Sequence, residues 1–451
     1  MQMNLKNLAE GDIGEHIKRM AMPAAIGLFF QAMYNVTDAY YVGQLSIAAL
    51  AAISLSFPIY FLILSIGSGL SIATTALTAK ARGAQHEHEA KHLAAQALVF
   101  GILLSVLAGV LGLVTADYLF SLIGAKGEVH KLVIEYMGMI YYGMPFFFLV
   151  MVLNGILNAV GDTKTFGKAI AFGFLLNIIL DPWFMYGWFG LPAMGVAGVA
   201  LATVVTQIIN TLWLFRQVMR YDILPKEIKD YLLVVGTWRK LAGQSIPTTL
   251  THASVSLGFL VIIIFVSSFG ELAIATYGIG TRIDQLIILP AIGIAGATVA
   301  LTGQNLGAKK IERINETFKK AIIYSMQFLV AGIAAVLIFA PQLAGIFTKD
   351  AKLIEMTTTY LRITSLAYIG VAILIISGSV LQGLAKAKHA LMLTFLRMVV
   401  ISIPAVLLFA YFLGLRELGI WLGVLASTLI MAGISYWYVN RMIGKLQLSK
   451  N

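Results

Sequence analysis

The sequence contains no cysteine. Disulfide bonds, zinc–thiolate sites, iron–sulfur clusters and thiol nucleophiles all require cysteine, so each of these is excluded. The sequence also has no GxxxxGK[ST], HExxH or GxSxG motif. These patterns are typical of nucleotide-phosphate binding, zinc-dependent hydrolysis and serine hydrolysis. Neither ATP-driven transport nor a familiar hydrolase is therefore indicated.

Charged residues are scarce. They make up 12% of the 451 residues, whereas 59% are hydrophobic. Typical soluble domains hold about 25% charged and about 45–50% apolar residues. With a mean hydropathy of +0.87, the chain has too little charge to cover a water-facing surface. We therefore expect most of it to lie in lipid, which excludes a cytosolic enzyme, a secreted disulfide scaffold and a disordered regulator.

The charge that is present is mostly positive, with 32 Lys and Arg against 21 Asp and Glu. In a membrane protein such an excess usually lies in cytoplasmic loops, so we expect no nucleic-acid partner. The first 19 residues carry several charges and no apolar stretch precedes Met20. A cleavable signal peptide is therefore not expected.

Twelve stretches are long and apolar enough to cross a bilayer as helices, and too long for the strands of a membrane barrel. The predicted fold is an all-α membrane protein with twelve transmembrane helices in two pseudo-symmetric six-helix lobes. The expected spans are residues 17–45, 47–79, 92–122, 131–158, 165–189, 193–218, 241–268, 273–304, 319–347, 354–384, 389–413 and 417–440.

The distribution of Lys and Arg predicts the orientation of these helices. The two termini and the even-numbered connections hold 24 of these residues, the opposite face holds five, and three lie within spans. Cytoplasmic loops carry the excess of positive charge. We therefore expect a multi-pass protein of the cell (inner) membrane with both termini in the cytoplasm.

The second half of the sequence resembles the first. Residues 153–164 match residues 377–388, and residues 195–203 match residues 419–427, both at an offset of 224 residues. Six helices per half give both halves the same orientation, a design found in transporters that bind substrate between two lobes. The expected domains are an N-terminal lobe with a cation site (1–218), a cytoplasmic linker (219–240) and a C-terminal lobe (241–451).

Four polar residues of the first half are expected to share one layer of the membrane. Asp38 and Asp181 lie roughly 10 and 12 Å below the outer ends of their helices, and Thr203 roughly 15 Å below the start of its helix. Asn177 lies one turn from Asp181 on the same helix face. Polar groups at such depth are costly and usually functional. Two carboxylates with an amide and a hydroxyl suit a proton or a bare alkali cation.

Simpler interpretations of these residues remain open. Asp38 could be an outer-end residue reached by water. Asp181 could sit at a helix break, because residues before a proline such as Pro182 avoid the α region. Asn177 and Thr203 could satisfy neighbouring helices only. Pro23 is a candidate hinge in the same helix as Asp38, although a proline kink can also be static.

The second half has its own charges within spans. Arg282, Asp284 and Arg397 each need a partner in a membrane, and a structural ion pair between Asp284 and Arg397 is one pairing that the sequence permits. His252 is expected to be a hydrogen-bonded packing residue.

The whole chain resembles the multidrug and toxic compound extrusion (MATE) transporters, in particular the prokaryotic subfamily named for DNA-damage-inducible protein F. The motifs that carry this resemblance are Tyr34-Asn35-Val36-Thr37-Asp38, Asn154-Gly155-Ile156-Leu157 with Gly161-Asp162, Asn177-Ile-Ile-Leu-Asp181-Pro182 and Gly198-Val-Ala-Leu-Ala-Thr203. The resemblance implies a V-shaped pair of six-helix lobes.

For the site, the resemblance implies a cation or proton at Asp38, Asn177, Asp181 and Thr203, with Na⁺ as the one metal considered. It assigns Asn154 to the same polar network, to which we add Tyr34 and Gln31, and it implies a helix bend at Pro23. Related branches have an acidic site in the C-terminal lobe on helices 7 and 10, where this chain has only Glu355. Asp284, Arg282 and Arg397 stay as charged candidates without a role.

The resulting functional prediction is an antiporter that is not an enzyme and has no cofactor. It would export bulky lipophilic, often cationic, drug-like compounds in exchange for H⁺ or Na⁺, without ATP. The main alternative is a flippase for lipid-linked oligosaccharides from the same superfamily, which a basic central cavity would favour. An intramembrane enzyme would need a converging set of catalytic groups, which is not evident, and the two-lobe repeat disfavours a passive channel.

Overall fold

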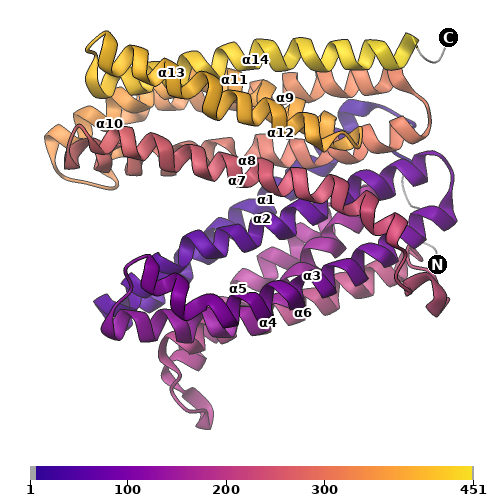
Figure 1. Ribbon diagram of the computed structural model, residues 1–451, viewed down its shortest axis with the longest axis horizontal. Helices are drawn as coiled ribbons and strands as arrows, with labels where there is room; N and C mark the ends of the chain where they lie inside the picture. The colour runs from indigo at the N-terminus through magenta and orange to yellow at the C-terminus, as the bar shows by residue number, and fades with distance from the viewer. Residues whose placement is uncertain (1–6, 449–451) are drawn as a thin grey trace. The chain divides into compact units, whose positions relative to one another are not determined.

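The computed structural model describes residues 7–448 and is almost entirely helical (Figure 1). This confirms the predicted all-α membrane class. Eleven helical segments in this range are long and apolar enough to cross a membrane. The remaining predicted span, 17–45, corresponds to α1 (Ile13–Leu45), whose sequence includes Lys18, Arg19 and Asp38 and is therefore less apolar.

The first half of the chain continues with five long helices, visible from indigo to magenta in Figure 1. Ser46 caps the first of them by accepting a hydrogen bond from the Ala49 amide. Between α5 and α6 lies a short 3₁₀ turn, η1 (Trp188–Gly190). The helices are α2 (Ile47–Gly83), α3 (Glu87–Leu122), α4 (Gly127–Ala159), α5 (Lys164–Tyr186) and α6 (Gly195–Arg220).

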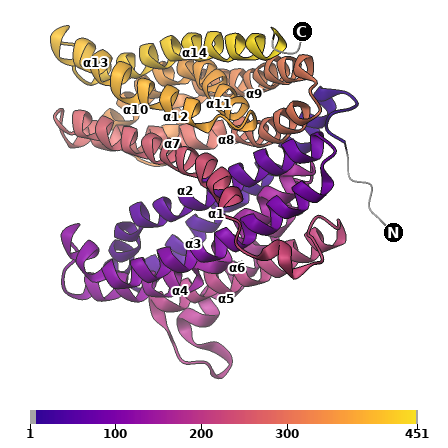
Figure 2. The same cartoon turned by 45° about the vertical axis from the view of Figure 1, so that its right-hand side comes forward.

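A connection with one 3₁₀ turn, η2 (Ile228–Tyr231), leads to the second half. Its helices can be followed from red to yellow in Figure 2. They are α7 (Val235–Ser267), α8 (Glu271–Gly307), α9 (Ile311–Gly345), α10 (Ala351–Thr364), α11 (Tyr368–Gly383), α12 (Ala387–Phe395), α13 (Ser402–Val406) and α14 (Arg416–Leu448).

Two of the predicted spans are interrupted. The stretch expected over 354–384 is divided by a 3₁₀ turn, η3 (Ser365–Ala367), between α10 and α11. The stretch expected over 389–413 has two π-helical segments, η4 (Leu396–Ile401) and η5 (Leu407–Phe412). Hydropathy does not detect such changes of helix type, because the side chains stay apolar while the backbone hydrogen bonds shift by one residue.

Packing divides the chain into two compact units, and at two points the chain passes between them inside a helix. One unit comprises residue 7 and residues 26–249, and the other comprises residues 8–25 together with residues from 250 onward. The crossings lie two residues after Pro23 in α1 and two residues after Pro247 in α7. A proline inside a helix removes one backbone hydrogen bond. Both crossings therefore fall where the helix is locally weakened, at the 224-residue spacing of the sequence repeat.

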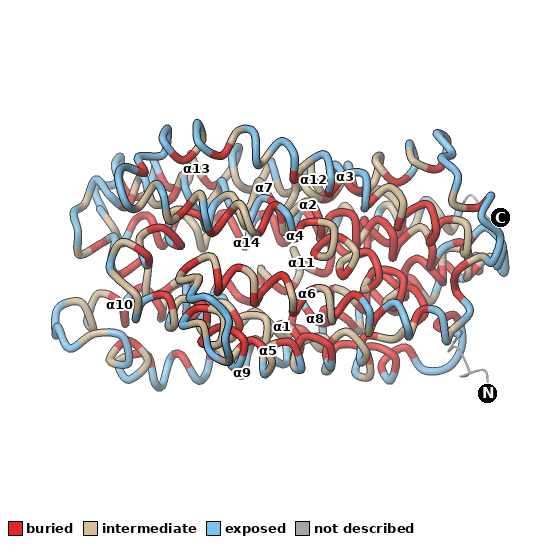
Figure 3. The backbone as a smooth tube through the Cα atoms, turned by 90° about the horizontal axis from the view of Figure 1, so that it is seen from below, coloured by how far each residue is buried: buried red, intermediate tan, exposed pale blue. Residues whose placement is uncertain are grey.

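In the first unit, α4 is the most buried long helix, whereas most of α7 is exposed or only partly buried (Figure 3). The large side chains of α4, among them Met137, Ile140 and Phe148, form one apolar cluster with residues of α2 and α6. This cluster packs the helices that hold the polar residues of the site described next.

Candidate functional site

The four polar residues predicted to share a layer come together inside the first unit. Asp38 lies on α1, Asn177 and Asp181 on α5, and Thr203 on α6. Their exposed fractions are 6%, 0%, 0% and 2%, in that order. Neither simple interpretation of the carboxylates fits this geometry. α5 continues through Pro182 to Tyr186, so Asp181 does not lie at a helix end. Asp38 is buried a full two turns before α1 ends.

Two hydrogen bonds link these four side chains in pairs, one within α5 and one between α6 and α1. Asn177 Nδ2 donates to Asp181 Oδ1 over 2.7 Å, as expected for residues four apart on one helix face. Thr203 Oγ1 lies 3.4 Å from Asp38 Oδ2. The carboxyl groups of Asp38 and Asp181 lie close to each other. The four side chains thus form one group that consists of two hydrogen-bonded pairs.

This group carries more negative charge than its surroundings balance. One carboxyl oxygen each of Asp38 and Asp181, and the side-chain oxygen of Asn177, have no hydrogen-bond partner within residues 7–448. No Lys, Arg or His of that range lies within ion-pair distance of either carboxyl. Two buried like charges without a counter-ion are strongly unfavourable. A bridging proton, or a small cation bound by these oxygens, removes that penalty, and oxygen ligands are those that hard cations prefer.

A small cavity opens next to Asp38. Its volume is about 20 Å³, enough for one water molecule or ion and far too small for a drug. Asn35 and Asp38 contribute from α1 and Tyr136 from α4, while α2 contributes Ile53, Ser56, Phe57 and Tyr60. The tyrosines and Ser56 were missed in the sequence, because a tyrosine within a span is usually an interfacial or packing residue.

Of the other predicted members of the network, Tyr34 lies beside this group, close to Thr203. Tyr34 is one turn from Asp38 on α1 and its buried hydroxyl has no hydrogen-bond partner in the described chain. Asn154 on α4 also has a buried oxygen without a partner, and Gln31 is half-buried. No hydrogen bond joins Gln31 or Asn154 to the four central residues. Pro23 lies near the other end of α1.

The expected ion pair between Asp284 and Arg397 is not formed. Asp284 instead accepts hydrogen bonds from Tyr360 over 2.8 Å and from Tyr368 over 2.5 Å. The two phenols flank the break between α10 and α11, with Tyr360 before it and Tyr368 directly after it, and the sequence did not predict this break. Arg397 lies in the π-helical segment η4, and its Nε has no partner among the described residues.

Two further predictions for the second half can be compared with the structure. Arg282 is exposed on α8, two residues from Asp284. His252 was expected to be hydrogen-bonded through its ring, but its buried Nε2 has no partner in the described part of the chain. Among residues 8–25 and 250–448, no cluster therefore matches the carboxyl pair of the first unit.

Comparison with known proteins identifies both halves of the chain. A family model described as MatE matches residues 23–183 and again residues 247–408. An FAD transporter of Shewanella oneidensis is 27% identical over 97% of this chain and 96% of its own. The multidrug export protein MepA of Staphylococcus aureus is 26% identical over 91% and 90%. A solved structure described as MATE in the bent conformation is 26% identical, with a TM-score of 0.93 over 100% and 99% of the two chains.

Proposed function

Since the chain belongs to the MatE family, we propose that it is a secondary active antiporter that exports bulky lipophilic, often cationic compounds in exchange for H⁺ or Na⁺. The family match covers both halves of a multi-pass membrane protein. MepA, one of the relatives above, is named as a multidrug export protein. Proteins of this family are transporters rather than enzymes, and the proposed function needs no cofactor and no ATP.

The observation that carries the proposal is the pair of buried carboxyl groups, Asp38 and Asp181. The two carboxyl groups lie close to each other, and no cationic side chain of residues 7–448 lies within ion-pair distance of either. Such a pair binds a cation in one state and must release it in another to be useful for transport. A cation that binds two conformations with different affinity shifts their equilibrium, which is the requirement for coupling.

In the proposed cycle, the outward-open protein takes up a proton at Asp38 or Asp181, or Na⁺ between Asp38, Asn177, Asp181 and Thr203. Neutralising this charge allows α1 to repack, with Pro23 as the hinge, and the drug leaves. The lobes then rock inward, the cation leaves and a new substrate enters. In support, Pro23 lies two residues before the point where α1 passes from one compact unit to the other.

We further propose that both termini and the connection between α6 and α7 face the cytoplasm. The 24-to-5 distribution of Lys and Arg supports this orientation. The functional lobes of the cycle are residues 1–218 and 241–451, joined by residues 219–240. The protein then lies in the cell membrane, with the lipid bilayer and small drug-like molecules as its partners.

A second candidate substrate is a flavin nucleotide. The relative that is 27% identical over nearly the whole chain is named as an FAD transporter. FAD is an anion, so its recognition would require basic groups at the substrate site rather than the pliable apolar lining suited to lipophilic cations. The oligosaccharide flippase also stays an alternative. Its substrates carry pyrophosphate, so it too would require basic groups at the substrate site.

Transport into inverted proteoliposomes distinguishes these substrates. With an imposed pH gradient and no ATP, we expect saturable accumulation of a fluorescent lipophilic cation, which collapses when an ionophore removes the gradient. A Na⁺ gradient is tested in parallel, and FAD is followed by its own fluorescence. Accumulation of FAD alone would replace the drug by the nucleotide as substrate. Failure of both compounds under both gradients would contradict antiport.

A further inference from the structure

In the connection between α6 and α7, several apolar side chains are exposed and one carboxylate is buried. A loop that faces water usually shows the reverse. Five large apolar residues in it or directly after it are exposed: Ile228 82%, Leu232 63%, Leu233 54%, Val234 39% and Val235 72%. The acidic residue among them, Asp230, is only 7% exposed. A contiguous apolar surface of this kind marks a binding site for another apolar phase, whereas scattered exposed apolar residues need no explanation.

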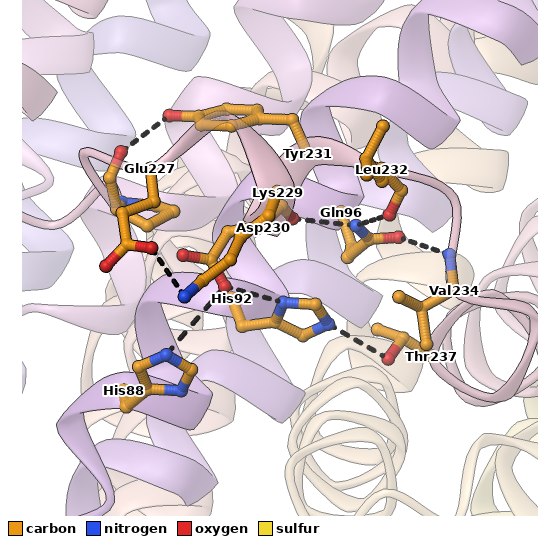
Figure 4. Close-up of polar contacts among 11 residues, drawn as sticks. His88, His92, Gln96, Glu227, Lys229, Asp230, Tyr231, Leu232, Val234 and Thr237 are labelled. Atoms are coloured by element: carbon orange, nitrogen blue, oxygen red, sulfur yellow. Dashed lines mark hydrogen bonds and ion pairs between the residues drawn. The ribbon is translucent and has the colours of Figure 1, made fainter.

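The inward side of this segment is held by a clasp from α3. Gln96 is completely buried, and its Nε2 donates to the carbonyl oxygens of Asp230 (2.8 Å) and Leu232 (2.7 Å). Its Oε1 accepts from the Val234 amide over 3.2 Å. Figure 4 shows the glutamine reaching all three backbone groups from one helix. The Gln96 side chain thus fixes the backbone of the segment, while the apolar side chains of the segment stay exposed.

Asp230 also faces α3. Its Oδ1 lies 3.5 Å from His92 Nδ1 and 3.8 Å from His88 Nε2, and Thr237 lies 3.4 Å from the other ring nitrogen of His92 (Figure 4). Asp230 therefore contacts α3 and does not face the outside. The exposed side chains of residues 226–235 are the apolar ones together with Lys226 and the pair of Glu227 with Lys229.

The corresponding segment before α1 behaves in the opposite way, although α1 and α7 are equivalent helices of the repeat. There the apolar residues point inward: Leu8, before α1, and Ile13 and Met20, in the first turns of α1, have no exposed surface. Its backbone is held by Gln304 and Asn305 of α8. The exposed apolar surface before α7 is thus not a general consequence of how a first helix begins in this fold.

We propose that residues 226–235 form an interfacial anchor that inserts its apolar side chains into the bilayer and contacts anionic phospholipid headgroups. The surface is continuous with α7, which starts at Val235 and is itself a membrane span. Exposed Lys226, Arg239 and Lys240 border it. Apolar side chains flanked by Lys and Arg are the composition with which segments bind an anionic membrane surface. Gln96 is the positioning residue that keeps the segment at this depth.

The absence of cysteine allows a direct test with single-cysteine variants. Leu233→Cys is labelled with bimane and reconstituted into phosphatidylcholine vesicles with one part in three of phosphatidylglycerol. Quenching by lipids brominated on the acyl chain is compared with two controls, Ile264→Cys on the exposed apolar face of α7 and Glu312→Cys on exposed polar surface. We expect quenching at residue 233 close to that at 264 and at least about threefold above that at 312, because the label lies in the acyl boundary.

Three results would contradict all or part of the proposal. Quenching of the residue 233 label by aqueous iodide, as strong as at 312, would show that the segment lies in water. A label shielded from both quenchers would show that protein, such as a second copy of the chain, covers the surface. Equal quenching by brominated lipid with and without phosphatidylglycerol would remove the anionic headgroup from the proposal. In the background of Gln96→Leu, the lipid quenching at 233 is expected to fall, because the clasp is lost.

Discussion

Replacing Asp38 with asparagine is expected to abolish gradient-driven export, with a decrease of at least about tenfold that corresponds to about 1.4 kcal/mol or more in the transition-state barrier. Asparagine has the size of aspartate and keeps an oxygen that can accept the Thr203 hydroxyl hydrogen bond. It cannot, however, take up or release a proton, and it lowers the negative charge that a sodium ion needs. Binding of the drug itself should persist, because the cavity at Asp38 is too small to hold it.

The matched control is Asp117→Asn in the same unit. Asp117 is an acidic residue on α3 whose side chain is 85% exposed, near His130. Export by this variant is expected to equal that of the wild type. If Asp38→Asn also exports at the wild-type rate, the coupling site lies elsewhere, and Asp181 and then Asp284 become the residues to replace. Size-exclusion profiles of all variants separate loss of coupling from loss of folding.

The substitution with the largest expected effect on stability is Gly155→Ala in α4. A Cβ at this position would fall on the carbonyl oxygen of Ser71 in α2 and lie 3.1 Å from Thr74 Cβ. The obstacle is backbone, which cannot rotate away as a side chain can. Overpacking of this kind costs about 1–3 kcal/mol. We therefore expect a lower melting temperature for Gly155→Ala, measured by tryptophan fluorescence because the chain has no thiol to report exposure.

Gly138→Ala, in the same helix, is expected to change the melting temperature in the opposite direction. No atom lies within 4 Å of a Cβ at position 138. Alanine in a helix interior is more favourable than glycine by about 0.5–1 kcal/mol. Gly138→Ala is thus expected to raise the melting temperature slightly while Gly155→Ala lowers it. Equal shifts for the two variants would show that the contact between α2 and α4 does not limit packing.

The part of the site predicted from the sequence follows from charge and helix periodicity. A carboxylate in a span stands out against an apolar background, and the spacing of Asn177 and Asp181 places both on one face of a helix. Counting residues from the helix ends then brought Asp38 and Thr203 to a similar depth. The structure brings these residues together in two hydrogen-bonded pairs, Asn177 with Asp181 and Thr203 with Asp38. Depth and helix face were sufficient here because the helices are long and regular.

Other features depend on contacts between helices and could not be read in this way. Tyr60 and Tyr136 line the cavity next to Asp38 from α2 and α4, yet in the sequence they resemble any other tyrosine of a span. Asp284 was paired with Arg397 because the sequence offers few cations, whereas two phenols satisfy it instead. Nothing in the hydropathy of residues 354–384 indicated the break between α10 and α11, which lies between those two tyrosines.

The exchange of a substrate for a cation is the central claim, and it can be measured on the purified protein. A lipophilic cationic substrate is added to the protein in weakly buffered solution near neutral pH, while a pH-sensitive dye and a sodium electrode record what is released. We predict that the substrate displaces H⁺ or Na⁺ from the wild type and that Asp38→Asn binds the substrate without this release. Substrate binding that releases neither cation, or a release that Asp38→Asn leaves unchanged, would contradict cation-coupled antiport through this site.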